Sequence, residues 1–208
     1  MGGVDKAALA VDGVTLLDRV LTAARPVCDQ LVVVGPTRPT GVAGVSFVTE
    51  AAPGGGPVPA VLAGVDACPR CDLVLVLAVD LPLLRSEDLR RLLVAVDQPG
   101  VDAAASGEGR GPNPLLAAYR VPALLARAGD PALGAGARAG RLLPASTVTV
   151  DLGPAALNVN RPEDLAAAAS AAVAGNRPGH GDEDAGEPGG GGEEDRPTDP
   201  REHRLRPE

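Results

Sequence analysis

Hydrophobic and polar residues alternate in blocks along this chain, and the longest apolar block ends in a carboxylate. Residues 73–79 read Leu-Val-Leu-Val-Leu-Ala-Val and are followed by Asp80, Leu81 and Pro82. An unbroken run of Val and Leu of this length is too short to span a membrane and is typical of a strand buried on both faces. Such a strand needs helices on both sides of its sheet. The pattern therefore predicts a parallel α/β sheet with Asp80 at its carboxyl edge, where such sheets bind ligands.

The blocks before and just after this strand repeat the alternation of strands and helices of a doubly wound fold. Apolar residues at helical spacing indicate helices, and short apolar runs indicate strands. The residues Ser86-Glu87-Asp88 predict a helix start with a hydroxyl N-cap and two acids in the first turn. The predicted elements are helices over residues 14–24, 58–67 and 86–96 and strands over residues 30–35 and 45–49.

The second half of the chain is less regular. It predicts strands over residues 102–106, 114–119 and 148–151, short helices over 122–128 and 136–143, an extended segment over 157–160 and a helix over 162–173. Beyond residue 174 the chain is rich in Gly, Pro and charged residues, with ten acids and five arginines. Such a segment cannot bury enough apolar surface to fold, so residues 1–174 are expected to form one domain and residues 175–208 a disordered acidic tail.

Composition and charge exclude several classes of protein. The chain has 208 residues and a formal net charge of −8, contains no Trp, and has one residue each of Phe, Tyr and Met. A protein that binds nucleic acid through its phosphates would need a basic face, and one that stacks bases would need aromatic side chains. No apolar run approaches the ~20 residues of a membrane-spanning helix, and no signal peptide is visible. With three cysteines, an odd number, the expected location is the reducing cytoplasm.

Two segments carry residues suited to phosphate and metal chemistry. Asp80 could cap the turn before Pro82, or it could bind Mg²⁺ together with substrate phosphates. Gly2 and Gly3 would let the backbone approach a phosphate closely, and Lys6 could lie along the phosphoryl oxygens. Lys6 is the only lysine among nineteen basic residues, all the others being arginine. A position that keeps a compact ammonium in such a chain favours a functional role.

Two further segments could contribute to a ligand site. The turn Gly54-Gly55-Gly56-Pro57 leads into a helix, so its backbone amides could bind an anion or could simply connect two elements. Asn158 and Asn160 alternate along an extended segment, which turns both side chains to one side. They could share a ligand or cap the helix that follows.

Cys68-Pro69-Arg70-Cys71 has the spacing of metal and redox motifs, but its context favours a plain structural role. A zinc site needs four ligands, and Cys28 with two histidines in the tail does not form a credible second pair. A redox pair would open a helix, whereas these cysteines precede a strand.

Taken in order, these segments resemble the molybdenum cofactor guanylyltransferases of the MobA-like NTP transferase family. The resemblance covers about residues 1–173. It rests on five stretches of sequence: Met-Gly-Gly-Val-Asp-Lys-Ala at 1–7, the Gly-rich turn with the helix start at 57–64, Val-Asp-Leu-Pro at 79–82, Asn-Pro-Leu-Leu-Ala-Ala-Tyr-Arg at 113–120 and Asn-Val-Asn-Arg-Pro-Glu-Asp-Leu at 158–165.

The resemblance implies a Rossmann-like three-layer nucleotidyltransferase fold with a mostly parallel sheet. The implied reaction moves GMP from GTP to the terminal phosphate of molybdopterin and releases pyrophosphate. Transient contacts with molybdenum-cofactor insertion proteins or molybdoenzymes would follow from it. No partner nucleic acid or membrane is expected.

The resemblance also implies roles for individual residues. Lys6 would contact the triphosphate, and Asp80 would hold Mg²⁺. Glu50 stands where the family has an aspartate near the guanine. Gly2, Gly3 and Gly56 would lie beside the nucleotide, and Arg110, Asn113 and Arg138 would anchor the phosphate of the acceptor. Asn158 and Asn160 match family residues on the pterin side or near the metal.

The chain departs from the family at its start. The family begins with a strand, normally central in the sheet, and a glycine-rich loop, and this chain starts at the Met near the end of that loop. A sheet without that strand would have two unpaired edges, and we expect the true start to lie upstream. Three functions stay open: GMP transfer to molybdopterin, transfer of CMP or to another small phosphate acceptor, and nucleotide binding without turnover.

Overall fold

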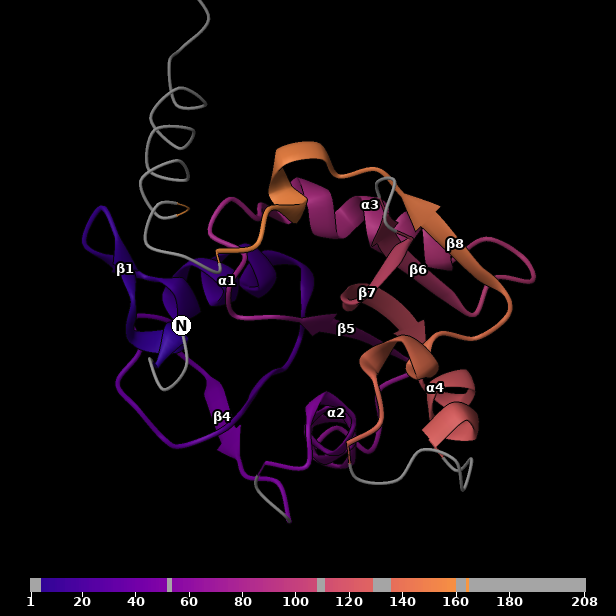
Figure 1. The fold of residues 1–208 in the computed structure, drawn as a ribbon, viewed down its shortest axis with the longest axis horizontal. Helices are drawn as coiled ribbons and strands as arrows, with labels where there is room; N and C mark the ends of the chain where they lie inside the picture. The colour runs from indigo at the N-terminus through magenta and orange to yellow at the C-terminus, as the bar shows by residue number, and fades with distance from the viewer. Residues whose placement is uncertain (1–4, 52–53, 108–110, 129–135, 160–163, 165–208) are drawn as a thin grey trace, which may run out of the picture. The chain divides into compact units, whose positions relative to one another are not determined.

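The structure is a computed structural model that describes residues 5–51, 54–107, 111–128, 136–159 and 164. Its elements follow one another as β-strands, α-helices and short 3₁₀-helices (η) (Figure 1). In chain order they are η1 (Lys6–Ala8), β1 (Ala10–Val11), β2 (Val14–Thr15), α1 (Leu16–Ala24), η2 (Arg25–Val27), β3 (Leu31–Val34), β4 (Val45–Val48), α2 (Pro57–Asp66), β5 (Leu73–Leu77), α3 (Ser86–Val96), β6 (Ala103–Gly107), β7 (Pro112–Arg120), α4 (Val121–Ala128), η3 (Ala139–Leu142), β8 (Thr147–Val150) and η4 (Gly153–Ala156).

The main sheet has four strands in the order β5-β7-β6-β8. Strand β7 runs antiparallel to both β5 and β6, while β8 runs parallel to β6. Three of the four strands therefore point the same way. Strands β3 and β4 pair in parallel as a second sheet. The predicted α/β fold with mostly parallel strands is confirmed, with β7 as the reversed strand.

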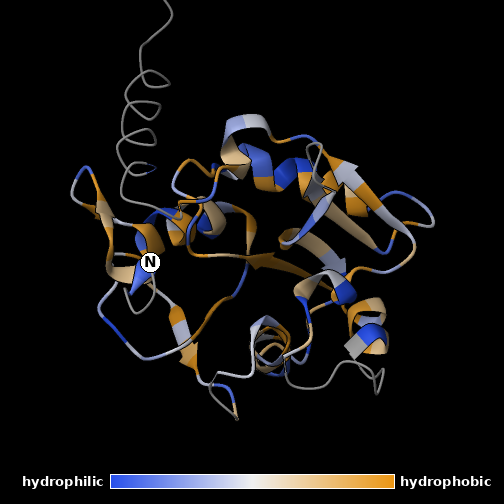
Figure 2. Ribbon diagram, in the orientation of Figure 1, coloured by the Kyte–Doolittle hydropathy of each residue, from blue (hydrophilic) through white to orange (hydrophobic). Residues whose placement is uncertain are grey.

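Helices cover both faces of the main sheet, which gives three layers. On one face Leu89 and Leu92 of α3, with side chains of α1, pack against Ala104 of β6 and Leu116 of β7. On the other face the side chains of α2, α4 and η3 pack against the alternate positions of the same strands, among them Tyr119. This period of two is what a strand between two helical layers requires. Figure 2 shows apolar residues gathered along β5 and β7.

Strand β5 is less buried than its sequence predicts. All five residues from Leu73 to Leu77 are half-exposed, although alternate side chains pack against the two cores on either side of the sheet. The predicted packing on both faces is thus confirmed, but the strand is neither fully buried nor central among the described strands. The reason lies in the pairing. Within the described part of the chain β5 pairs only with β7, and β3 pairs only with β4. Each of these two strands thus has one edge without a neighbouring strand among the described residues.

The chain also forms a hairpin that was not predicted from the hydrophobic pattern. Strands β1 and β2 pair antiparallel around Asp12 and Gly13, which both have positive φ values, 52° and 78°. An Asp-Gly pair is a strong signal for this kind of turn. The predicted helix over residues 14–24 therefore begins two residues later, at Leu16.

Two further predictions need correction. Helix α3 spans Ser86–Val96 as predicted, but Arg85 is its N-cap, and the Asp88 carboxylate accepts the Arg85 N–H at 3.0 Å. Residues 136–143 form only the short η3. Residues 157–159 have no regular secondary structure, and Leu157 has the extended backbone expected there. The predicted helix over 162–173, apart from Asp164, and the tail lie outside the described residues. The boundary at residue 174 stays a prediction.

No helix in the described residues is long and apolar enough to cross a membrane.

Candidate active site

The structure brings together Lys6 and Asp80, which are 74 positions apart in the sequence. The Nζ atom of Lys6 donates to Oδ2 of Asp80 at 2.8 Å. The side chain of Lys6 is 29% exposed and that of Asp80 12% exposed. Charge-assisted hydrogen bonds of this length are stronger than neutral ones. The site therefore contains a fixed, partly buried pair of opposite charges.

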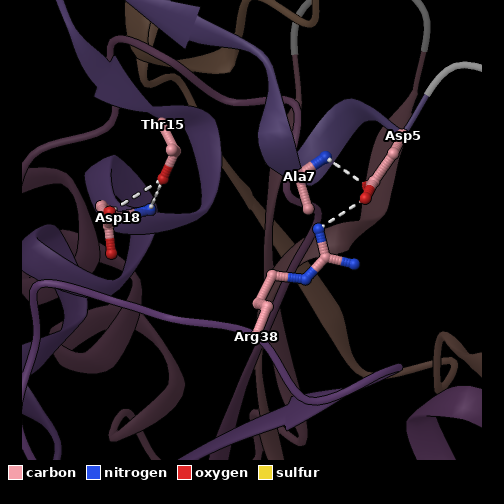
Figure 3. A network of polar contacts seen from close by, with 5 residues as sticks. All are labelled: Asp5, Ala7, Thr15, Asp18 and Arg38. Atoms are coloured by element: carbon pink, nitrogen blue, oxygen red, sulfur yellow. Dashed lines mark hydrogen bonds and ion pairs between the residues drawn. The ribbon is translucent and has the colours of Figure 1, made fainter.

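The backbone around Lys6 is held by its neighbour Asp5. The Asp5 side chain caps η1 by accepting the N–H of Ala7 at 3.1 Å. The same carboxylate binds the guanidinium of Arg38 at 2.7 Å (Figure 3). Lys6 is the first residue of η1, so these two contacts position the backbone from which its side chain reaches Asp80.

A second polar network fastens the segment after β3 to the start of α1. The N-cap hydroxyl of Thr15 accepts the N–H of Asp18 and donates to its carboxylate (Figure 3). The other carboxylate oxygen accepts the hydroxyl of Thr40 at 2.5 Å and the N–H of Gly41 at 3.0 Å. These hydrogen bonds, that of Thr40 first, lower the pKa of Asp18, although burial opposes them. The segment that carries Arg38 is thereby held close to η1.

A backbone hydrogen bond holds the turn that carries Asp80. Asp80 lies three residues beyond the end of β5, and its carbonyl accepts the N–H of Val159 at 2.9 Å. This bond brings Asn158, which is half-exposed, next to the Asp80 turn. Three predicted segments, those of Lys6, Asp80 and Asn158, thus meet beyond the carboxyl end of β5. This is the edge at which α/β sheets bind ligands.

Two carboxylate oxygens in the described structure are buried without a hydrogen-bond partner. They are Oδ1 of Asp80 and Oε2 of Glu50, which follows β4. A buried, unsatisfied acceptor is costly unless a ligand completes it. The carboxylate oxygen of Asp80 is a hard oxygen ligand of the kind that Mg²⁺ prefers. No set of three or more His, Cys, Asp or Glu residues in the described ranges could hold a metal alone. The donors present fit an ion that one carboxylate shares with substrate phosphates.

The glycine-rich turn meets a different segment. Gly56 is the N-cap of α2 with φ at 92°, a conformation that favours glycine. The N–H of Gly136 donates to the carbonyl of Gly55 at 2.9 Å. Arg138, two residues further on, is exposed at the start of η3. Two of the predicted contributors, Gly56 and Arg138, therefore lie on segments in direct contact.

The other predicted site residues stand apart or lie outside the described structure. Asn113 is on β7, and its Oδ1 accepts the N–H of Leu115 at 3.0 Å, which is a local turn-like role. Gly2, Gly3, Arg110 and Asn160 lie outside the described residues.

Sequence reasoning missed Asp5 and Arg38, which hold η1. An Asp one residue before a helix is a recognisable capping signal. The contact between Asp5 and Arg38 spans 33 positions, and no local pattern announces it.

Comparisons with known proteins identify the family of this chain. Residues 1–147 match the family described as the MobA-like NTP transferase domain. A molybdenum cofactor guanylyltransferase of Bradyrhizobium sp. (strain ORS 278) is 31% identical over 128 residues, which cover 58% of this chain and 60% of that protein. The chain thus spans less than two thirds of the length of this curated relative.

Solved structures show the same fold. The molybdopterin-guanine dinucleotide biosynthesis protein A of Archaeoglobus fulgidus is similar with a TM-score of 0.62 and 23% identity, over 83% of this chain and 92% of that one. The 2-C-methyl-D-erythritol 4-phosphate cytidylyltransferase of Thermus thermophilus has a TM-score of 0.61 and 23% identity, over 81% of this chain and 93% of that one. By its match over residues 1–147, this chain belongs to the family of MobA-like NTP transferase domains.

Proposed function

We propose that this chain transfers the GMP unit of GTP to the terminal phosphate of molybdopterin and releases pyrophosphate. The observation that carries the proposal is the contact of Lys6 Nζ with Asp80 Oδ2 at 2.8 Å, beside a second Asp80 oxygen that is buried without a partner. Family membership and the name of the Bradyrhizobium relative support the choice of nucleotide and acceptor.

Each half of the charge pair has a task in such a reaction. Asp80 would hold Mg²⁺, whose charge would polarise the α-phosphate of the nucleotide. Lys6, on its short 3₁₀-helix, donates hydrogen bonds to the triphosphate and offsets the negative charge that grows on pyrophosphate. Before substrate binds, the ion pair holds both side chains in position. Lys6 then leaves the Asp80 oxygen and binds the triphosphate.

The transfer itself needs no general base. An oxygen of the acceptor phosphate, already ionised at neutral pH, attacks the α-phosphorus. The bond between that phosphorus and the bridging oxygen breaks, and pyrophosphate departs with the electron pair. The protein's main contribution is therefore to position two phosphates and to neutralise their charge.

The remaining residues are assigned to the two substrates. On the nucleotide side we place the backbone of Gly2, Gly3 and Gly56 together with Glu50. On the acceptor side we place Asn158, which lies next to the Asp80 turn, with Asn160, Arg110 and Arg138. Asn113 is placed there too, because its Oδ1 accepts the N–H of Leu115 while its amide NH₂ group can donate to a phosphate.

The test is pyrophosphate release from GTP or CTP with Mg²⁺ and molybdopterin. We expect release that depends on molybdopterin and favours GTP. Asp80→Asn should lower kcat by at least about 10²-fold, the usual effect of removing one electrostatic group from a reacting site. Asp97→Asn is the matched control, because its side chain is 79% exposed at the end of α3.

Each alternative has its own outcome. Release with CTP only would assign a cytidylyltransferase, and full turnover of Asp80→Asn would overturn the role of Asp80. Absence of release, both in this chain and in one extended by the codons upstream of Met1, would favour nucleotide binding without turnover.

A further inference from the structure

Cys68 and Cys71 occupy the ends of a tight turn between α2 and β5. The N–H of Cys71 donates to the carbonyl of Cys68 at 3.1 Å, and the N–H of Cys68 donates to the carbonyl of Val65 at 2.8 Å. A hydrogen bond between residues i and i+3 defines a β-turn, whose end Cα atoms lie within about 7 Å. Most of that range is compatible with a disulfide. Pro69, at the second position of the turn, restricts the backbone further.

The two cysteines of this turn are accessible to reagents. Both cysteines are free and half-exposed, so small molecules can reach them. Burial, and after it the charge of the neighbouring Cys71, raises the pKa of Cys68. Exposed Arg70 in the middle of the turn adds a positive charge between them. The sequence context favoured a structural role because the pair does not open a helix, but the turn brings the Cα atoms of the two cysteines within the range of a disulfide without one.

The third cysteine lies nearby and does not share the turn. Cys28 is half-exposed, and its pKa is raised, first by burial and also by the charge of Cys71. The side-chain amide of Gln30 donates to the carbonyl of Ala67 at 3.4 Å, which ties the Cys28 segment to the end of α2. In the residues that the structure describes, no group of three or more potential ligands could hold a metal. The three thiols are thus not arranged as a metal centre, and the adjacent pair is left for redox chemistry.

We propose that Cys68 and Cys71 form a dithiol that small disulfides of the glutathione class oxidise to an intramolecular disulfide. The Cys71 thiolate attacks one sulfur of glutathione disulfide, and the first glutathione leaves as a thiolate that takes up a proton. The Cys68 thiol then loses its proton and attacks the Cys71 sulfur, which expels the second glutathione. Two cysteine thiols are oxidised and one glutathione disulfide is reduced to two glutathione molecules.

The position of this turn separates it from the proposed catalytic site. The turn precedes β5, and Asp80 follows the opposite end of the same strand. Because Pro69 and the backbone hydrogen bond already close the turn, the disulfide would remove little additional chain entropy. We therefore expect oxidation to change the denaturation midpoint only slightly.

The test uses the full chain and glutathione disulfide as the probe. After incubation, free thiols are blocked with N-ethylmaleimide, and the products are analysed by intact mass and peptide mapping. The wild-type chain should lose two hydrogen atoms and keep one of its three thiols for alkylation, with Cys68 joined to Cys71. Reduced glutathione in excess should restore all three.

Variants make the outcome specific. Cys28→Ser should form the same disulfide and keep no thiol for alkylation, while Cys68→Ser and Cys71→Ser should stop at a glutathione adduct. The proposal is overturned if the wild-type chain keeps three thiols or a stable adduct, or if mapping joins Cys28 to either partner.

Discussion

Strands β5 and β6 lie on either side of β7 in one sheet, yet their burial is the reverse of what their side chains favour. Strand β5 consists of Leu and Val, and every residue in it is half-exposed. Strand β6 begins Ala-Ala-Ala-Ser, and these four residues are at most 1% exposed. The difference follows from their neighbours, because β6 lies between β7 and β8 whereas β5 pairs with β7 alone among the described strands. The hydropathy of a strand thus indicates how much burial it can accept. The strands beside it determine how much of it is actually buried.

The cross-strand pair of Leu77 and Leu116 tests this comparison most directly. The two residues face each other across β5 and β7, and Leu116 is fully buried while Leu77 is half-exposed. Leu116→Ala should lower the free energy of unfolding by about 3 kcal/mol, since it leaves a cavity. Leu77→Ala should cost about 1 kcal/mol, because less apolar surface leaves water on folding. Urea denaturation measures both, and equal costs would contradict the comparison.

Enlarging a side chain should give the same ranking, with the buried position less tolerant than the half-exposed one. Ala104 of β6 is fully buried between α3 and the sheet, so Ala104→Leu should destabilise the fold by about 2 kcal/mol through overpacking. Val76→Leu on half-exposed β5 should change stability by less than about 0.5 kcal/mol. Thermal denaturation of the two variants side by side would refute the idea if Val76→Leu were the more harmful.

Tyr119 extends the comparison to β7, the strand that pairs with both β5 and β6. It lies on β7 opposite Val74 of β5 and Ala103 of β6, and its hydroxyl donates to the carbonyl of Pro114 at 2.9 Å. Tyr119→Phe should cost about 1 kcal/mol in the free energy of unfolding, because that carbonyl loses its partner. Urea denaturation of the variant measures this cost. A value near zero would mean that water replaces the hydroxyl.

The same residue predicts an alkaline effect. Burial raises the pKa of Tyr119, so the folded chain keeps its proton at a pH where the unfolded chain loses it. The unfolded state then binds fewer protons, and stability should fall as pH rises above about 10. Tyr119→Phe should show a shallower decline when denaturation midpoints are measured over the same range. If the stability of both proteins fell equally with pH, ionisation of the Tyr119 phenol would not be the cause of the decline.

Asp18 provides the smallest effect and concerns the part of the chain around β3 and β4. Hydrogen bonds from Thr40, Thr15 and Gly41 lower its pKa, so its contribution is present at neutral pH and is lost as pH falls below about 4. Solvent screening reduces that contribution to about 0.5 kcal/mol. The stability of Asp18→Asn should therefore fall less than that of the wild-type chain between about pH 6 and pH 3. An identical acid profile would assign the loss to other carboxylates.

Local patterns predicted most elements of this protein. The runs at β3, β4 and β5 and the helical spacing of α1 and α3 identified those elements within a few residues, because side-chain period follows backbone geometry. The carboxyl end of β5 located Asp80, and the single lysine in a chain full of arginine drew attention to Lys6. Only the tertiary structure joined these two at 2.8 Å and placed Val159 against Asp80.

The burial of β5 was also decided by the tertiary structure alone. Its Leu and Val sequence is compatible with complete burial, but the chain provides a neighbour on one side only among the described strands. The local chemistry of a sequence determines which of its surfaces are apolar enough to favour burial. Which of them are covered depends on contacts between distant segments, and these exist only once the chain has folded.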